Sequence, residues 1–221
     1  MSHPSIPQHP VPPLAPASVV EALRTVVTPQ LSDNLDRMSG ITALIRYHRG
    51  RKLVGTAFTV KTRPGDNLPI YHAMPLLQPG HVLVIDGGGD TSNALVGDLI
   101  LTYLLQRGCV GLVVDGVVRD TAAFLQADFP CYARGVSHRG PYKNGPGALN
   151  VPVAIAGQVV NPGDIVVGDE DGIVTFPQAD AQRLLDAARR SAAKEDAIRA
   201  EILTGRVQQS WLEPYLQPQA R

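Results

Sequence analysis

The 221-residue chain has little cysteine and no net charge, and each shortage excludes a class of protein. Its two cysteines, Cys109 and Cys131, do not have the spacing of a metal site, so we expect both to be reduced and buried in a cytoplasmic protein. Twenty basic residues balance twenty acidic ones, so no excess charge draws the protein toward a nucleic acid or an anionic membrane. No apolar run reaches the roughly 18 residues of a membrane helix.

The first residues also lack the features of a signal peptide, because no basic segment precedes an apolar one there. Six prolines within residues 1–16 instead favour an extended polyproline-type arm, either mobile or laid on a neighbour.

Several catalytic signatures are missing. The chain has no phosphate-binding GxxxxGK[ST] loop, no GxSxG nucleophile elbow, no HExxH and no CxxC, and the three glycines at 87–89 are not GxGxxG. None of the four lysines has the apolar surroundings that would activate it for Schiff-base chemistry. The common nucleotide-binding, serine hydrolase and zinc protease classes are therefore excluded.

What is present predicts an α/β protein. Strand-like segments at 53–62, 79–89 and 111–115 alternate with helical ones over 68–78, 94–108 and 121–127, with short strands from residue 150 and a long helix near 179–203. We expect a proline-rich arm at 1–17, one domain with a mixed sheet at 18–205, and a polar tail at 206–221.

The first candidate site is a helix start in the segment "LVGDLI". Gly97 allows a close approach of the backbone, and the N–H groups of Asp98, Leu99 and Ile100 would be free at a helix N-terminus, where they could bind a carboxylate or phosphate. The alternative is a glycine selected for packing, with Asp98 as an ordinary acidic residue of the first turn.

The second candidate is the segment "GVVRD", which ends with two opposite charges just past a buried strand. Ligands bind at the carboxyl ends of parallel strands. Asp120 could hold a divalent cation such as Mg²⁺, which needs only one or two carboxylates, and Arg119 could hold a carboxylate or keto oxygen. The alternative is that Asp120 caps the following helix.

Three other polar sites have simpler explanations. We expect Asp66 to be part of a Pro-Gly turn and helix cap, and His72 to be packed or exposed on a helix. The segment "GDEDG" at 168–172 lacks the spacing of a calcium loop and predicts a turn between strands.

The order and spacing of "PGDN", "HVLVIDGGG", "ALVGDLI", "RGCVGLVVDGVVRD" and "NPGDIVVGDEDGIVTFP" resemble the RraA-like superfamily. Within it, the chain is most similar to the 4-hydroxy-4-methyl-2-oxoglutarate/4-carboxy-4-hydroxy-2-oxoadipate aldolases, over roughly residues 19–201. The resemblance implies a swivelling β/β/α fold, assembly into trimers or hexamers, and a class II aldolase that uses Mg²⁺ or Mn²⁺ and releases pyruvate.

The resemblance also implies roles for individual residues. Backbone amides of Gly97, Asp98, Leu99 and Ile100, together with Arg119, match the part of the family that binds pyruvate. Asp120 matches the metal ligand. An acid from the C-terminal helix of an adjacent subunit orients metal-bound water; Glu195 is the nearest match, and Asp196 is the alternative.

Two other functions stay open at this stage. The same superfamily contains the protein-binding inhibitor of ribonuclease E, in which the acid after the arginine is missing, so Asp120 favours the enzyme. A related lyase or decarboxylase of another 2-keto acid would use the same chemistry, and oxaloacetate decarboxylation is an expected side activity.

Overall fold

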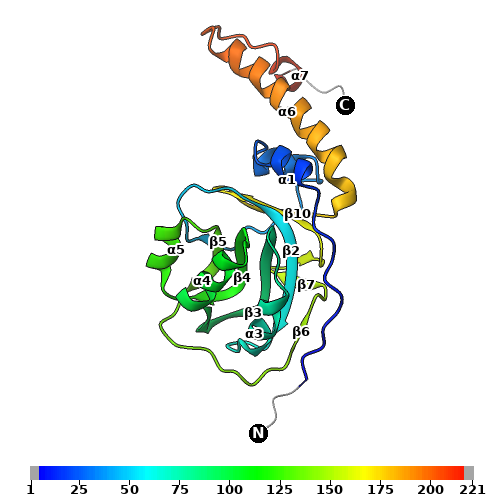
Figure 1. Ribbon diagram of the computed structural model, residues 1–221. Helices are drawn as coiled ribbons and strands as arrows, with labels where there is room; N and C mark the ends of the chain where they lie inside the picture. The colour runs from blue at the N-terminus through cyan, green and yellow to red at the C-terminus, as the bar shows by residue number, and fades with distance from the viewer. Residues whose placement is uncertain (1–4, 217–221) are drawn as a thin grey trace, which may run out of the picture.

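A computed structural model describes residues 5–216 and contains a large mixed sheet with helices on its faces (Figure 1). The strands are β1 (Ile45–Arg46), β2 (Leu53–Thr62), β3 (His81–Val96), β4 (Gly111–Val118), β5 (Cys131–Val136), β6 (Gly147–Leu149), β7 (Val153–Ile155), β8 (Gln158–Val160), β9 (Ile165–Asp169) and β10 (Gly172–Phe176). The helices are α1 (Ala17–Leu23), α2 (Thr28–Asp33), α3 (Leu68–Ala73), α4 (Asp98–Gln106), α5 (Thr121–Ala127), α6 (Ala181–Ile202) and α7 (Glu213–Leu216).

The main sheet has the order β1-β5-β4-β3-β2-β9-β10, and β6 pairs with β2 outside this path. Strands β2, β3, β4 and β5 are parallel to one another, whereas β1, β9 and β10 pair antiparallel at the edges. The α/β class and mixed sheet predicted from the sequence are confirmed. Because β3 and β4 are parallel neighbours, their carboxyl ends lie side by side.

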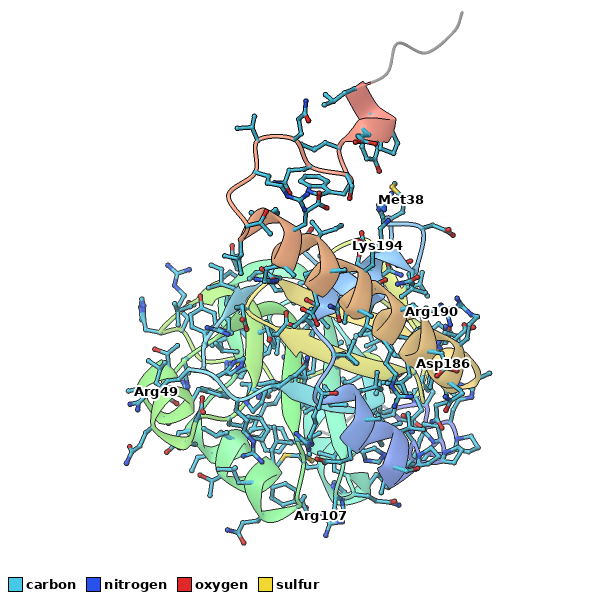
Figure 2. All side chains as sticks on the ribbon, turned by 90° about the horizontal axis from the view of Figure 1, so that it is seen from above. Met38, Arg49, Arg107, Asp186, Arg190 and Lys194 are labelled. Carbon is cyan, nitrogen blue, oxygen red and sulfur yellow. The ribbon has the colours of Figure 1, made fainter. Side chains whose placement is uncertain are left out.

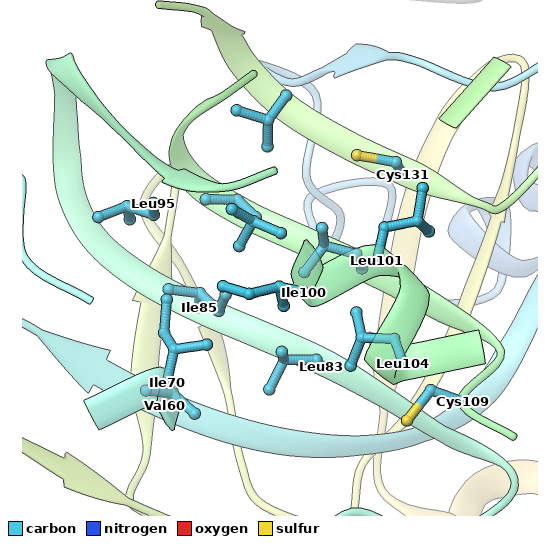
Figure 3. Close-up of a cluster of buried hydrophobic side chains, with 14 of the residues drawn as sticks. Val60, Ile70, Leu83, Ile85, Leu95, Ile100, Leu101, Leu104, Cys109 and Cys131 are labelled. Atoms are coloured by element: carbon cyan, nitrogen blue, oxygen red, sulfur yellow. The ribbon is translucent and has the colours of Figure 1, made fainter. Parts of the chain in front are cut away.

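Hydrophobic side chains fill both faces of the sheet. Helices α3, α4 and α5 cover one face, where Ile100, Leu101 and Leu104 pack onto Leu83 and Ile85 of β3 (Figure 3). The small β7–β8 hairpin packs on the opposite face. A further cluster joins α1, α2 and α6 to β9 and β10. Full burial of one such side chain contributes about 1.5–3 kcal/mol, so these contacts fix where α4 begins.

One helix boundary differs from the prediction. Residues 94–96 were expected to be helical, but they continue β3 and pair with β4, because a short buried apolar run suits either structure. Register shifts beyond Asp86 let β3 pass through its three glycines. Pro29 lies in the first turn of α2, where its missing N–H costs no hydrogen bond.

The proline-rich arm lies against its own chain over the described residues. The Leu149 N–H donates to the Pro7 carbonyl (2.8 Å), and the His9 N–H donates to the Leu149 carbonyl (3.1 Å). Ile6 and Val11 pack against the core below α3 and α4. The arm is therefore part of the folded body over the described residues; residues 1–4 lie outside them.

The C-terminal helix α6 is buried only at its beginning, and polar side chains as far along as Glu195 still contact α2. Its buried residues all lie between Ala181 and Ala188, and the rest of the helix extends away from the sheet (Figure 1). Figure 2 shows Asp186, Arg190 and Lys194 along this helix. Residues 217–221 of the predicted tail lie outside the described residues. Within residues 5–216, no helix has the length and apolarity of a membrane span.

His81 is a fully buried histidine at the start of β3. Its Nδ1 accepts a hydrogen bond from the Gln78 N–H (3.0 Å), so the proton of the neutral ring belongs on Nε2, which has no partner among the described residues. Burial lowers the pKa of His81 from 6.5 to about 4.

We therefore expect the free energy of unfolding to fall as the pH decreases from about 6.5 to about 4. The unfolded chain takes up a proton in this range and the folded chain does not, so about 3 kcal/mol present above pH 6.5 is progressively lost. Urea unfolding of the wild type and His81→Gln across this range tests the expectation. The variant should show a weaker pH dependence, and the exposed-site control His72→Gln should not. An unchanged slope in His81→Gln would contradict the assignment.

Candidate functional site

The two candidate segments meet at the carboxyl ends of β3 and β4. Gly97 and the start of α4 follow β3, and Arg119 and Asp120 follow β4. The Arg119 N–H donates to the Val96 carbonyl (3.0 Å), which holds the two strand ends together. The structure thus brings together six of the residues that the sequence singles out: Gly97, Asp98, Leu99, Ile100, Arg119 and Asp120.

Asp120 stands at the N-terminus of α5 but does not cap it. Its backbone is left-handed, with φ +58° and ψ +39°, and its side chain makes no capping hydrogen bond to α5. A residue other than glycine adopts this conformation at a cost of about 1 kcal/mol. The carboxylate is turned toward α4, so the simple capping explanation is not what the structure shows.

The Asp120 carboxylate lies at the first N–H group of α4. Its Oδ2 accepts a hydrogen bond from the Asp98 N–H (3.0 Å) and lies 3.5 Å from the Arg119 Nε. The Asp98 N–H, expected to be free, is therefore occupied. The N–H groups of Leu99 and Ile100 have no partner among the described residues and remain available to an anion.

This packing requires glycine at position 97 because there is no space for a Cβ atom, and not because of the backbone angles of Gly97. A Cβ at this position would lie 2.5 Å from Asp120 Oδ2, 2.9 Å from Arg119 Cγ and 3.0 Å from Arg119 Nε. Its φ of −143° is open to any residue. The sequence offered two explanations for Gly97, a ligand site and close packing. Both apply, because the glycine packs against Arg119 and Asp120, the side chains proposed to bind ligand.

Two hollows open beside these residues. The narrower, of about 50 Å³, lies between α3, the start of α4 and the loop after β5. It is lined by Asn67, Tyr71, Ala94, Leu95, Val96, Gly97, Asp98, Leu99, Ile100, Arg119, Pro141 and Lys143. The wider one, of about 460 Å³, is lined by Arg119, Asp120, Val136, Ser137 and His138. Arg119 borders both, so one ligand could reach the guanidinium and the Asp120 carboxylate together.

Asn67 is a site residue that the sequence analysis missed. It is 3% exposed, its Nδ2 donates to the Leu95 carbonyl (3.1 Å), and its Oδ1 has no partner among the described residues. A buried, unpaired acceptor is costly, so it is usually kept for a ligand or an ordered water. Its position in the segment "PGDN", beside a turn, was the only signal in the sequence.

The loop after β5 forms the outer wall of the narrow hollow. Lys143 lies with its Nζ 5.5 Å from the centre of the Tyr71 ring, within the range of a cation–π contact. The Ala94 N–H donates to the Arg139 carbonyl (2.9 Å), which ties the loop to β3. Two exposed cations of this loop, Arg139 and Lys143, therefore stand near the site.

Glu195 is not brought to this site within one chain. It lies on α6, where its Oε2 accepts a hydrogen bond from the Gln30 Nε2 (3.1 Å), and Asp196 beside it is exposed. No residue of α6 lines either hollow next to Arg119. A role for Glu195 in this chemistry requires a second copy of the chain.

The other polar residues lie near their expected positions, except that Asn67, and not Asp66, is the N-cap residue of α3. The Asp66 carboxylate accepts the Leu68 N–H in the first turn of α3, and His72 is exposed on that helix. The segment "GDEDG" turns between β9 and β10, and its Asp169 accepts hydrogen bonds from both the N–H and the hydroxyl of Thr28. Cys109 and Cys131 are free and buried.

The donor set at the site suits a cation that keeps most of its water. Among the described residues, no three His, Cys, Asp or Glu side chains gather as a metal cage. The Asp120 side chain is 46% exposed and projects beside an open hollow. One carboxylate with room for water and ligand oxygens fits Mg²⁺ or Mn²⁺ and does not fit the three or four protein ligands of zinc.

The chain is similar to proteins of one family. A family model described as Aldolase/RraA matches residues 28–175. A relative from Halalkalibacterium halodurans named "Putative 4-hydroxy-4-methyl-2-oxoglutarate aldolase" is 36% identical over 179 residues, which are 80% of this chain and 85% of the relative.

Solved structures of RraA proteins share the fold. RraAS2 of Streptomyces coelicolor, described as an unusual member of the RNase ES inhibitor RraA protein family, has a TM-score of 0.77 and 28% identity, and the match covers 84% of this chain and 98% of that one. The RNA-processing inhibitor RraA from Thermus thermophilis has a TM-score of 0.63 and 29% identity, with 68% and 92% covered.

We expect Gly97→Ala to fold but to displace the Asp120 carboxylate, because the added methyl group would overlap its Oδ2. A crystal structure of the variant should show the bond between the Asp98 N–H and Asp120 broken. Gly50→Ala is the matched control, since a Cβ there meets no atom within 4 Å. An Asp120 side chain that keeps its place in Gly97→Ala would show that the close packing is not a constraint.

Proposed function

The chain belongs to the RraA-like family of aldolases and RraA proteins, and we propose that it is a divalent-metal-dependent aldolase. Its substrate would be 4-hydroxy-4-methyl-2-oxoglutarate or 4-carboxy-4-hydroxy-2-oxoadipate, cleaved to pyruvate and a second 2-keto acid. Oxaloacetate decarboxylation would follow from the same chemistry. The observation that carries the proposal is the position of Asp120. Its carboxylate is turned away from its own helix and lies beside Arg119 and near two backbone N–H groups that have no partner within residues 5–216.

Substrate binding follows from the groups around the narrow hollow. The Leu99 and Ile100 N–H groups at the helix start would hold the carboxylate of the pyruvate unit. The Arg119 guanidinium would hold the 2-keto oxygen, where negative charge appears as the bond breaks. Asp120 would hold Mg²⁺ or Mn²⁺, which supplies Lewis acidity to that oxygen when bound.

The reaction would be a retro-aldol cleavage. A base removes the proton of the C4 hydroxyl, the C3–C4 bond breaks, and its electron pair passes to the pyruvate unit as an enolate, whose C3 is then protonated. Asp98, exposed at the start of α4, and Glu195 of an adjacent subunit are the acids proposed to move this proton through water. Such a role for Glu195 requires assembly into trimers or hexamers.

The distal part of the substrate would meet the loop after β5. Lys143 lines the hollow, and Arg139 is a second cation of the same loop, whose carbonyl accepts the Ala94 N–H. A second carboxylate on the substrate would therefore find a complementary charge at the end opposite the pyruvate unit. This supports a dicarboxylic or tricarboxylic 2-keto acid over pyruvate-like monoacids, and leaves a related 2-keto acid lyase as the nearest alternative.

The competing function is inhibition of a ribonuclease by binding. Solved RraA proteins share the fold, and their matches cover 84% of this chain for RraAS2 and 68% for the Thermus protein. The retained Asp120 and the long α6 are the features that favour the enzyme.

Release of pyruvate from 4-hydroxy-4-methyl-2-oxoglutarate with Mg²⁺ tests the proposal. We expect Asp120→Ala and an excess of chelator each to reduce turnover by about 10³-fold or more, because the charge forming on the keto oxygen loses its stabilisation. Asp171→Ala, in the β9–β10 turn, is a matched control that should keep full activity. Turnover that survives chelation would exclude the metal mechanism, and ribonuclease binding without turnover would favour the inhibitor.

Mixed assemblies test the role of Glu195. Asp120→Ala and Glu195→Gln subunits should each be nearly inactive alone. After co-assembly, about a quarter of the sites combine an intact Asp120 with an intact neighbouring Glu195, so activity should return. Asp196→Asn mixed in the same way identifies the alternative acid. No recovery from any mixture would place the second acid within the same chain or remove it from the mechanism.

A further inference from the structure

Asp66 is a completely buried carboxylate with an unusually full set of donors. Its Oδ1 accepts the Leu68 N–H (2.9 Å), and its Oδ2 accepts the N–H groups of Asn144 (2.7 Å) and Gly145 (3.0 Å). The Arg63 Nη2 donates to the same Oδ2 (2.9 Å). The Leu68 bond alone would serve as a helix cap. The other bonds reach a segment about 78 residues away in the chain, so they fix something besides α3.

Backbone bonds continue this attachment on both sides of Asp66. The Tyr142 N–H donates to the Gly65 carbonyl (2.8 Å), and the Asn67 N–H donates to the Tyr142 carbonyl (2.9 Å). The Arg63 guanidinium also lies 6.0 Å from the centre of the Tyr142 ring. Residues 142–145 are therefore held along the turn at 63–67 as a short strand-like segment.

The same turn also contacts the opposite wall of the site. Asn67 donates to the Leu95 carbonyl (3.1 Å) at the end of β3, just before Gly97. The loop carries Pro141 and Lys143, which line the narrow hollow across from the start of α4. The turn thus sets the distance between the wall proposed to hold pyruvate and the wall that carries the distal cation.

We propose that Asp66 is a positioning residue, whose carboxylate fixes the loop so that Lys143 can bind the distal carboxylate of the substrate. This inference rests on the proposed aldolase function and names the part of the molecule that determines substrate class. We place Asp66 away from the substrate, because its side chain is fully buried and lines neither of the two hollows beside Arg119.

An ionised carboxylate is the side chain that fits this position. Its partners are three N–H groups and one guanidinium, all of them donors, and a carboxylate is acceptor-only. An asparagine would direct its NH₂ group at one set of donors and leave them unpaired. Burial by itself would raise the pKa of Asp66, but the Leu68, Asn144 and Gly145 N–H groups and the Arg63 charge lower it below its ordinary value of 3.8.

Asp66→Asn tests the proposal with two reactions that differ in their need for the loop. Cleavage of 4-hydroxy-4-methyl-2-oxoglutarate uses the distal carboxylate, whereas exchange of the pyruvate methyl protons with deuterium does not. We expect kcat/KM for cleavage to fall about 10- to 100-fold, mainly through KM, and the exchange rate to change by less than about 3-fold. Lys143→Gln should show the same pattern.

The matched control is Asp164→Asn, at a buried aspartate in the turn before β9. Burial raises the pKa of Asp164, so a neutral amide suits that site better than it suits Asp66. Both reactions should be unaffected in the control. Asp66→Glu should restore part of the lost cleavage if the negative charge is what holds the loop.

Hydrogen exchange of the loop amides tests the attachment without any activity. In Asp66→Asn the N–H groups of residues 142–145 should exchange at least about 10-fold faster, while those of β3 and β4 keep their protection. The positioning role would be overturned if Asp66→Asn lowered cleavage and pyruvate proton exchange equally. It would also be overturned if the loop N–H groups kept their protection from hydrogen exchange. A wild type that cleaves no 2-keto acid would contradict the proposed function. The exchange rates of the N–H groups of residues 142–145 would still show whether Asp66 holds the loop in place.

Discussion

The site depends on one contact, the hydrogen bond that the Asp120 carboxylate accepts from the first N–H group of α4. This hydrogen bond of 3.0 Å joins the end of β4 to the helix that follows β3, across 22 residues of sequence. It forms because parallel neighbours end at the same edge of the sheet, and because Gly97 leaves no Cβ between them. Without the parallel pairing of β3 and β4, or with a side chain at Gly97, we expect that Arg119 and Asp120 would no longer face the same hollow.

The cost of this arrangement is met by the surrounding core. The left-handed backbone of Asp120 costs about 1 kcal/mol. The Asp120 carboxylate and the Arg119 guanidinium are only partly buried, so the cost of removing water from these two charges is small. Against this, Ile100, Leu101 and Leu104 anchor α4, and Phe124 anchors α5, each contributing about 1.5–3 kcal/mol by burial. A well-packed pair of helices can therefore hold a strained residue between their starting points.

The sequence reveals local features of this protein better than distant ones. Strand β2 was predicted at its observed bounds, and Arg119 and Asp120 were found because a buried strand and a glycine turn precede them. Asn67 was missed, and Asp66 was explained as a cap alone. Their decisive partners, Leu95 and the loop at 144–145, are far along the chain, and no periodicity encodes such contacts.

A single chain leaves the site more open than the proposed chemistry requires. The Arg119 and Asp120 side chains are 41% and 46% exposed, and Leu99 beside them is 81% exposed. Water at these charges would weaken the stabilisation of an enolate, which is strongest where solvent is excluded. In the assembly that we propose, a neighbouring copy that covers the exposed Leu99 would also exclude water from the site. Helix α6 has no buried residue after Ala188, so its exposed second half, with Glu195, is the element that we propose for contact with an adjacent subunit.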